Sequence, residues 1–240
     1  MYDFKKGEVV LINKPVTWTS FDIVNSFRHF MRAKLALGKL KVGHAGTLDP
    51  LATGLLLVCT GPFTKRIVEF TDYDKEYTGT IMLGATTASF DSEQPVDQTY
   101  PIDHITEELL LAAARKQTGI IQQVPPIFSA VKIEGKHAYE YARKDREVTM
   151  PPKEINISEF EITRIALPEI DFRIVCSKGT YIRAIARDFG EDVRSGGYIT
   201  SLCRTRIGPF HLRDAWELNA LKAALLAEKS AAVEAESIGE

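Results

Sequence analysis

Apolar residues recur at helical intervals near the start of the chain. The first such repeat comprises Phe21, Val24, Phe27 and Met31. Thr19 and Asp22 precede its body and stand three residues apart, as in a capping box at a helix N-terminus. We therefore predict a helix that begins at Thr19 or Ser20 and buries the face that carries Phe21.

Two further helices are predicted nearer the C-terminus. Thr106–Gly119 has acids in its first turn, bases in its last turn and a glycine stop, which suits the helix dipole. A helix that opens after Gly179-Thr180 has an apolar face of Ile182, Ile185, Ala186, Phe189 and Val193. After Trp216 we expect only one or two amphipathic turns, followed by a frayed, alanine-rich end.

Strand-like runs outnumber the helices and follow one another in groups. They are Glu8–Asn13, Leu55–Thr60, Glu76–Gly84, Ile155–Ile165, Ile170–Ser177 and Ile199–Ile207. In the third run, Tyr77 and every second residue after it form one face. Runs of strands joined by short turns favour an α+β fold. We expect a mixed, mostly antiparallel central sheet flanked by helices and loops.

The length of 240 residues suits one large domain or a domain and a half. We assign residues 1–213 to one domain and residues 214–240 to a short acidic tail. Residues 122–152 differ in composition, because Pro125-Pro126 and Pro151-Pro152 bracket a turn and a mixed-charge run. We predict a mobile excursion there with one short helix, not a separate domain.

The charges are segregated along the chain, although their sum is only −2. From Arg28 to Leu48 there are five basic residues and no acid, and from Arg173 to Arg213 there are eight against three acids. From Asp214 onward there are six acids against two lysines. One basic run is usually a solvated surface. Two runs beside glycine-rich motifs favour nucleic-acid binding.

Several chemistries lack their sequence signatures. Three cysteines, Cys59, Cys176 and Cys203, are far apart and match neither a zinc site nor a disulfide framework. We therefore expect no metal and a reduced, cytoplasmic setting. The chain has no phosphate-binding loop and no dinucleotide motif, so we expect no nucleotide cofactor. No apolar run approaches the roughly 18 residues of a membrane span, so we expect no membrane partner.

Residues 43–54, GHAGTLDPLATG, combine three glycines with one acid. Pro50 pushes Asp49 toward extended geometry. A lone carboxylate in such a loop acts as a nucleophile or base, or it is only a turn residue. A cation would keep it ionised. Arg183 is a candidate, unless it lies on a helix surface. Tyr77 could stack on a base, unless it is a core aromatic.

Six segments, taken in chain order, carry a joint pattern. They are VLINKPVTWTSFD, GHAGTLDPLATGLL, DKEYTGTIMLG, VPPIFSAVKIEGKHAYEYAR, CSKGTYIRAIARDFGE and LCRTRIGPF. Together they resemble the TruB-type tRNA pseudouridine-55 synthases, from about Val10 to Phe210. The resemblance implies the pseudouridine synthase fold, with residues 122–152 as an RNA-clasping insertion that becomes ordered on RNA. It also implies isomerisation of a T-loop uridine of tRNA by a monomer that flips the base and needs no cofactor.

The resemblance also implies roles for single residues. Asp49 is the catalytic aspartate, Tyr77 stacks near the target base, and Arg183 pairs with Asp49. Substrate or RNA contacts are implied for His44, Lys14, Asp91, Lys132 and Leu202. Among these, Leu202 forms an apolar wall, His44 contacts or replaces flipped nucleotides, and Lys14 belongs to a motif whose role is mainly structural.

The chain departs from the family pattern in two places. The run T-D-T-x-D is Thr87-Ala88-Ser89-Phe90-Asp91 here, so its first aspartate is lost. We also expect no additional C-terminal RNA-binding module, which argues against a guide-RNA-dependent relative. Two alternatives stay open: a pseudouridine synthase acting on another RNA, and a non-catalytic RNA-binding or RNA-folding protein. A base deaminase would need a C-x-x-C zinc motif, which is absent.

Overall fold

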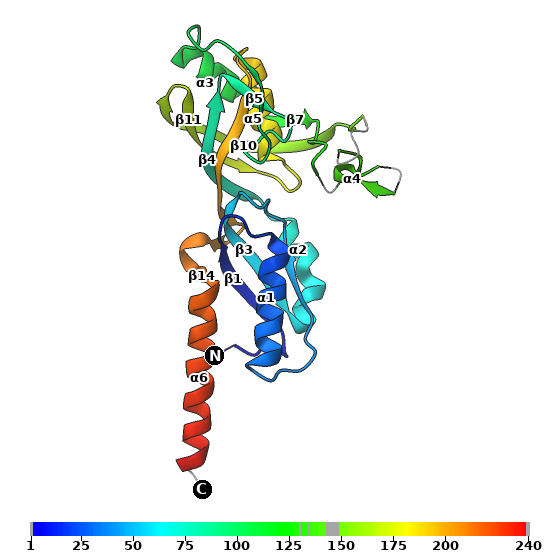
Figure 1. Ribbon diagram of the computed structural model, residues 1–240, viewed down its shortest axis with the longest axis vertical. Helices are drawn as coiled ribbons and strands as arrows, with labels where there is room; N and C mark the ends of the chain where they lie inside the picture. The colour runs from blue at the N-terminus through cyan, green and yellow to red at the C-terminus, as the bar shows by residue number, and fades with distance from the viewer. Residues whose placement is uncertain (1, 130, 134, 143–148, 239–240) are drawn as a thin grey trace. The chain divides into compact units, whose positions relative to one another are not determined.

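The computed structural model describes residues 2–129, 131–133, 135–142 and 149–238 (Figure 1). The chain forms two compact units. Unit 1 comprises Met1–Tyr73 and Cys203–Glu240, and unit 2 comprises Asp74–Leu202. The strand β12, Gly197–Ile207, contributes its first half to unit 2 and its second half to unit 1.

The sheet of unit 1 is built on β3, Thr53–Thr60, which is buried along almost its whole length. The strands β1, Val9–Lys14, and β2, Val42–Ala45, both pair with β3 in antiparallel register. The second half of β12 pairs with β3 in parallel. The short strands are β13, Phe210–His211, which pairs with β12, and β14, Trp216–Glu217, which lies parallel to β1.

The helix α1, Ser20–Ala33, confirms the predicted capping box, in which Thr19 Oγ1 accepts from the Asp22 N–H. Its buried face contains Ile23, Val24, Phe27, Phe30 and Met31. The prediction that Phe21 belongs to this face is wrong, because its side chain is exposed. The first turn of α1 points Phe21 away from the core.

The C-terminal helix α6, Leu218–Ile238, is much longer than the predicted one or two turns. Leu218, Leu221 and Leu225 join the same core cluster as α1, and alanine has the highest helix propensity. The packing of its first turns, together with its alanine-rich composition, therefore explains why the helix continues to Ile238. The other helical segments of unit 1 are η1 (Gly61–Arg66), α2 (Ile67–Thr71) and η2 (Leu212–Asp214).

Unit 2 contains a sheet in the order β12, β4, β11, β10, β7. Its strands are β4 (Lys75–Leu83), β11 (Glu169–Cys176), β10 (Lys153–Ala166) and β7 (Gly119–Gln123). The pairs β4–β11, β11–β10 and β10–β7 are antiparallel. The predicted hairpin across Leu167-Pro168 is confirmed, and so is the mostly antiparallel sheet. A second small sheet pairs β5 (Ala85–Thr87) with β6 (Val96–Thr99).

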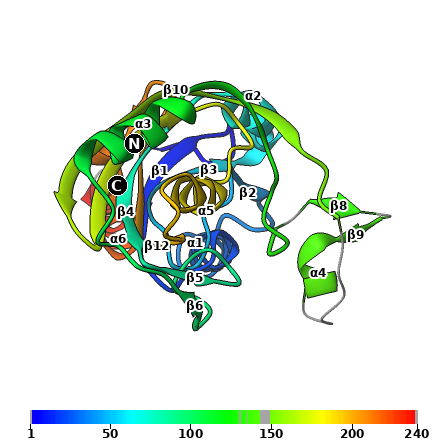
Figure 2. The same cartoon turned by 90° about the horizontal axis from the view of Figure 1, so that it is seen from above.

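Two helices of unit 2 match their predictions. They are α3 (Glu107–Lys116), capped by Thr106, and α5 (Ile182–Asp192). Figure 2 looks along α5 and shows β4 and β10 curving around it, and Phe189 of α5 contacts Phe160 of β10. Because the predicted face of α5 is buried here, α5 holds Arg183 inside unit 2.

The predicted insertion contains the short helix α4, Ala138–Ala142, as expected. It also contains the hairpin β8–β9, Lys132–Ile133 with Lys136–His137, which was not expected. Residues 130, 134 and 143–148 of this predicted insertion lie outside the described residues. Among the helices that the structure describes, none combines the length and the apolar character that crossing a membrane requires.

Candidate active site

Asp49 lies in unit 1, on the connection between β2 and β3. The expected loop over residues 43–54 is shorter than predicted, because β2 includes Gly43–Ala45 and β3 begins at Thr53. The main chain turns back at the acid, where the Ala52 N–H donates to Asp49 O at 3.1 Å. The Leu48 N–H donates to Ser20 Oγ at 2.9 Å. The first residue of α1 therefore fixes the segment just before Asp49.

Arg204 of β12 anchors the same connection from the other side. Its buried guanidinium donates to Leu55 O at 2.8 Å, Gly46 O at 3.1 Å and Thr47 O at 3.4 Å. The backbone of β12 comes so close that a Cβ on Gly54 would lie 2.4 Å from Arg204 O. Only glycine allows this approach, and its φ of +103° also favours glycine.

Lys14, at the end of β1, is buried directly behind this connection. Its ammonium donates to Trp18 O at 2.6 Å, Pro15 O at 2.9 Å and Pro50 O at 3.2 Å. Burial lowers the pKa of Lys14 to about 8; Asp49 opposes this shift and Arg204 adds to it. All three donors therefore point to main-chain oxygens, which suits a residue that positions the turn beside Asp49.

The Lys14 ammonium should titrate near pH 8, well below the ordinary value of 10.5. Because the folded chain favours the neutral amine, the unfolded chain binds more protons between these two values. The Lys14 contribution to the free energy of unfolding should then rise with pH across this window. NMR titration of isotopically labelled lysine, with Lys14→Met to assign the signal, measures the pKa directly. A Lys14 signal that titrates with the exposed lysines would contradict this geometry.

His44 lies on β2, where it pairs with Val58 of β3. Its Nδ1 is buried and makes no hydrogen bond within the described part of the chain. Burial lowers the pKa of His44, and Arg204 lowers it further. The imidazole is therefore neutral near pH 7.

Tyr77, Leu202 and Lys132 lie in unit 2. Tyr77 is on the buried face of β4, as the alternation predicted, in register with Ile174 of β11. Leu202 is partly buried in β12. The backbone of β12 approaches β4 closely, since a Cβ on Gly79 would lie 2.3 Å from Ser201 O. Lys132 begins β8, where its main chain pairs with His137.

Arg183 is buried in unit 2, so the alternative of a helix-surface arginine is wrong. Its guanidinium donates to Ser89 O at 3.0 Å and to Phe128 O at 2.9 Å. It also forms an ion pair with Asp91, with 3.6 Å between Nε and Oδ2. The Asp91 carboxylate also accepts from Ser89 Oγ at 2.5 Å and from the Glu93 N–H at 3.0 Å. Asp91 is therefore placed to orient Arg183.

The predicted site residues fall into two groups, one in each unit. Asp49, His44 and Lys14 share unit 1 with Arg204, whose charge acts on both Lys14 and His44. Tyr77, Arg183, Asp91, Lys132 and Leu202 belong to unit 2. The pairing of Arg183 with Asp49 stays a prediction. Arg204 was missed as a site residue, although an arginine within a predicted strand was a signal for it.

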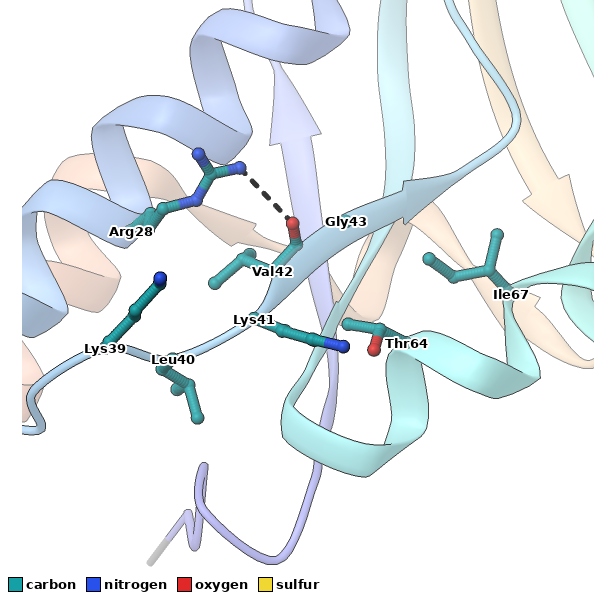
Figure 3. A pocket seen from close by; sticks show the side chains of 8 residues that line it. All are labelled: Arg28, Lys39, Leu40, Lys41, Val42, Gly43, Thr64 and Ile67. Atoms are coloured by element: carbon teal, nitrogen blue, oxygen red, sulfur yellow. Dashed lines mark hydrogen bonds between the residues drawn. The ribbon is translucent and has the colours of Figure 1, made fainter.

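A basic pocket of about 460 Å³ opens at the base of β2 in unit 1. Figure 3 shows Lys39 directed toward Arg28 of α1, and Lys41 directed toward Thr64 of η1. Arg28 also donates to Val42 O at 3.3 Å, and none of the described residues that line the pocket is acidic. Three cations around one opening favour an anionic ligand such as a phosphate. His44 follows two residues after Val42.

Within the described residues, no three His, Cys, Asp or Glu side chains form a group that could hold a metal ion. Solved structures with the same fold include an H/ACA RNP bound to a substrate RNA containing 2′-deoxyuridine. That match has a TM-score of 0.69 at 21% identity, and covers 95% of this chain and 56% of that chain. The chain thus spans little more than half of that protein.

Sequence comparisons point to one family. The profile of the "TruB family pseudouridylate synthase (N terminal domain)" matches residues 32–182. A tRNA pseudouridine synthase B from Phocaeicola vulgatus is 54% identical, over 88% of this chain and 90% of that protein. A protein of the same name from Parabacteroides distasonis is 56% identical, over 86% of this chain and 88% of that protein. The chain belongs to the TruB family of pseudouridylate synthases.

Proposed function

We propose that the protein isomerises uridine to pseudouridine in the T loop of tRNA, at position 55. Relatives named tRNA pseudouridine synthase B support this reaction, as they match almost the whole chain. The observation that carries the proposal is the Asp49 turn. Lys14, Ser20 and Arg204 hold it through main-chain hydrogen bonds, so one carboxylate is presented in a fixed position.

The reaction rearranges one nucleoside without adding a group. The N1–C1′ bond breaks, the uracil turns, and C5 bonds to C1′, while C5 loses a proton and N1 gains one. Asp49 acts on the sugar or the ring as nucleophile, or removes the C5 proton as base. Lys14, at the end of β1, donates to Pro50 O and so holds the main chain next to Asp49.

The target base is stacked within a folded loop, so it must leave the stack before Asp49 can reach it. Base flipping costs a few kcal/mol. Stacking on Tyr77 and contacts from His44 would offset this cost. Arg183, oriented by Asp91, supplies the cation that the family resemblance pairs with Asp49. Asp91 then acts through Arg183 as a positioning residue.

Binding of the tRNA stem rests on phosphate contacts. The basic pocket of Figure 3 supplies three cations, and the segment over residues 122–152 clasps the RNA and becomes ordered with it. We include in this proposal that the enzyme acts in the cytoplasm as a monomer. Residues 1–213 then act as one catalytic domain built from both units, and residues 214–240, which belong to unit 1 and pack there through the start of α6, are not a separate RNA-binding module.

Neutralising the basic pocket should weaken tRNA binding without changing the chemical step. For the double variant Lys39→Gln, Lys41→Gln we expect about a tenfold rise in KM for tRNA at 0.1 M salt, with kcat within about twofold of wild type. The slope of log Kd against log salt should fall by about 2. Arg115→Gln, Arg194→Gln is the matched control, since both arginines are exposed and belong to unit 2. An unchanged salt slope would remove the pocket from the RNA interface.

The decisive test is to incubate the protein with unmodified tRNA and to map pseudouridine at single-base resolution. We expect one modified position, in the T loop. Modification of a different RNA, or of a different position, would support the proposed reaction but would contradict the proposed substrate. No pseudouridine in any RNA that the protein binds would favour a non-catalytic RNA-binding protein and overturn the proposal.

A further inference from the structure

Three exposed apolar residues form a cluster in sequence around the start of α1, and their segment is hydrogen-bonded to the Asp49 turn. Val16, Trp18 and Phe21 are 50%, 37% and 58% exposed, although they lie within six residues of one another. Scattered exposed apolar residues are ordinary, but a group of three with two aromatic rings marks an interaction surface. This is also where the prediction that Phe21 is buried failed, because α1 directs other residues to the core.

The backbone of this segment is held in a strained conformation. Thr17 has a φ of +72°, which is an outlier for a β-branched residue. Its N–H donates to Pro50 O at 2.8 Å, and the buried Lys14 holds Trp18 O and Pro50 O together. Such strain persists only where surrounding structure imposes it, and it concentrates at functional sites. The same main-chain oxygen therefore ties the cluster to the residue next to Asp49.

A hollow of about 430 Å³ lies against Trp18, lined also by Thr17, Asp22, Asn25 and Ser26. Its volume is in the range of small-ligand pockets, about 300–1,000 Å³. No cation lines it. The Asp22 carboxylate is engaged by the Thr19 N–H and hydroxyl at 2.8 and 2.6 Å. An aromatic wall beside the amide of Asn25 and the hydroxyl of Ser26 suits a nucleobase, whereas a phosphate would meet the Asp22 carboxylate here and belongs to the basic pocket.

We propose that Trp18 forms a stacking platform for an unpaired nucleobase of the substrate RNA other than the target uridine. The inference rests on the proposed function, and it adds a second base-binding position at the Asp49 turn. A base has an apolar face and a polar edge, so the ring of Trp18 would take its face while Asn25 and Ser26 meet its edge. The occupant is RNA, because this surface continues directly from the turn that must reach the target nucleotide.

Tryptophan fluorescence tests the contact directly, because the chain has only two tryptophans. Trp18 and Trp216 are almost equally exposed, at 37% and 38%, so each serves as the control for the other. The measurement uses the Asp49→Asn variant, which should bind RNA without converting it. In the Trp216→Phe form of this variant only Trp18 emits, and we expect a T-arm hairpin RNA to quench its fluorescence. The Trp18→Phe variant should show much weaker quenching. A blunt RNA duplex without unpaired bases should quench neither.

Kinetics separate stacking from folding. We expect Trp18→Ala to raise KM for tRNA at least about fivefold, with kcat within about threefold of wild type, and Trp18→Tyr to restore KM. Val68→Ala, at a 70% exposed apolar position of α2, should change neither. Equal quenching of both tryptophans, or an unchanged KM in Trp18→Ala, would overturn the platform while pseudouridine formation continued. If the wild-type protein made no pseudouridine but Trp18 were still quenched, the proposed function alone would fail.

Discussion

Replacement of Asp49 by asparagine should abolish pseudouridine formation while tRNA affinity stays within about tenfold of wild type. The substitution keeps the size of the side chain and removes its charge. Lys14, Ser20 and Arg204 hold the turn through its main-chain atoms, and these hydrogen bonds remain in the variant. The loss should therefore fall on the chemical step. Single-turnover assays at saturating enzyme separate that step from binding.

Two controls make the Asp49 result specific. Asp103→Asn removes an exposed carboxylate of unit 2 and should leave turnover unchanged. Asp49→Ala guards against slow deamidation of the new asparagine back to aspartate. If both Asp49 variants retained appreciable turnover, Asp49 could not be the reacting group. If both lost tRNA binding and turnover together, the carboxylate would be needed for binding and the turn would be less rigid than the structure indicates.

The predicted elements that were confirmed are those with strong local patterns. The capping box of α1 and the hairpin of β10 and β11 are set by residues close in sequence, so periodicity and turn chemistry found them. The errors have the opposite origin. The burial of Phe21 and the length of α6 depend on which faces the sheet and the neighbouring helix leave open. A helical repeat shows that a face is apolar, but tertiary packing decides where that face ends.

The same distinction applies to the candidate site. Asp49 was found because a lone acid between glycines and a proline is a local pattern. Arg204 was not, because its bonds to Gly46 and Leu55 join residues about 150 positions apart in the chain. Lys14 looked like a motif residue of mainly structural role, and only the structure shows its three main-chain acceptors. Residues that hold a catalytic turn from behind leave little trace in the sequence around it.

Arg204 should therefore be the residue of unit 1 whose loss most disturbs Asp49 without touching substrate. Arg204→Met leaves three carbonyl oxygens without their donors. We expect the free energy of unfolding to fall by about 3 kcal/mol, since each buried unsatisfied group costs about 1–3 kcal/mol and the site relaxes in part. Turnover should fall about 100-fold at saturating tRNA, because a displacement of about 1 Å at a catalytic group has that effect.

Arg204→Lys and the titration of Lys14 distinguish positioning from simple loss of stability. A lysine restores the charge but cannot form the forked contact, so it should recover stability in part and turnover less. Arg204 also lowers the pKa of Lys14, so its removal should move the Lys14 titration upward from about 8. Arg213→Met, at an exposed position, is the matched control. Assays run well below the unfolding midpoint keep the folded population constant. Full turnover of Arg204→Met under these conditions would show that the Asp49 turn keeps its geometry without the guanidinium.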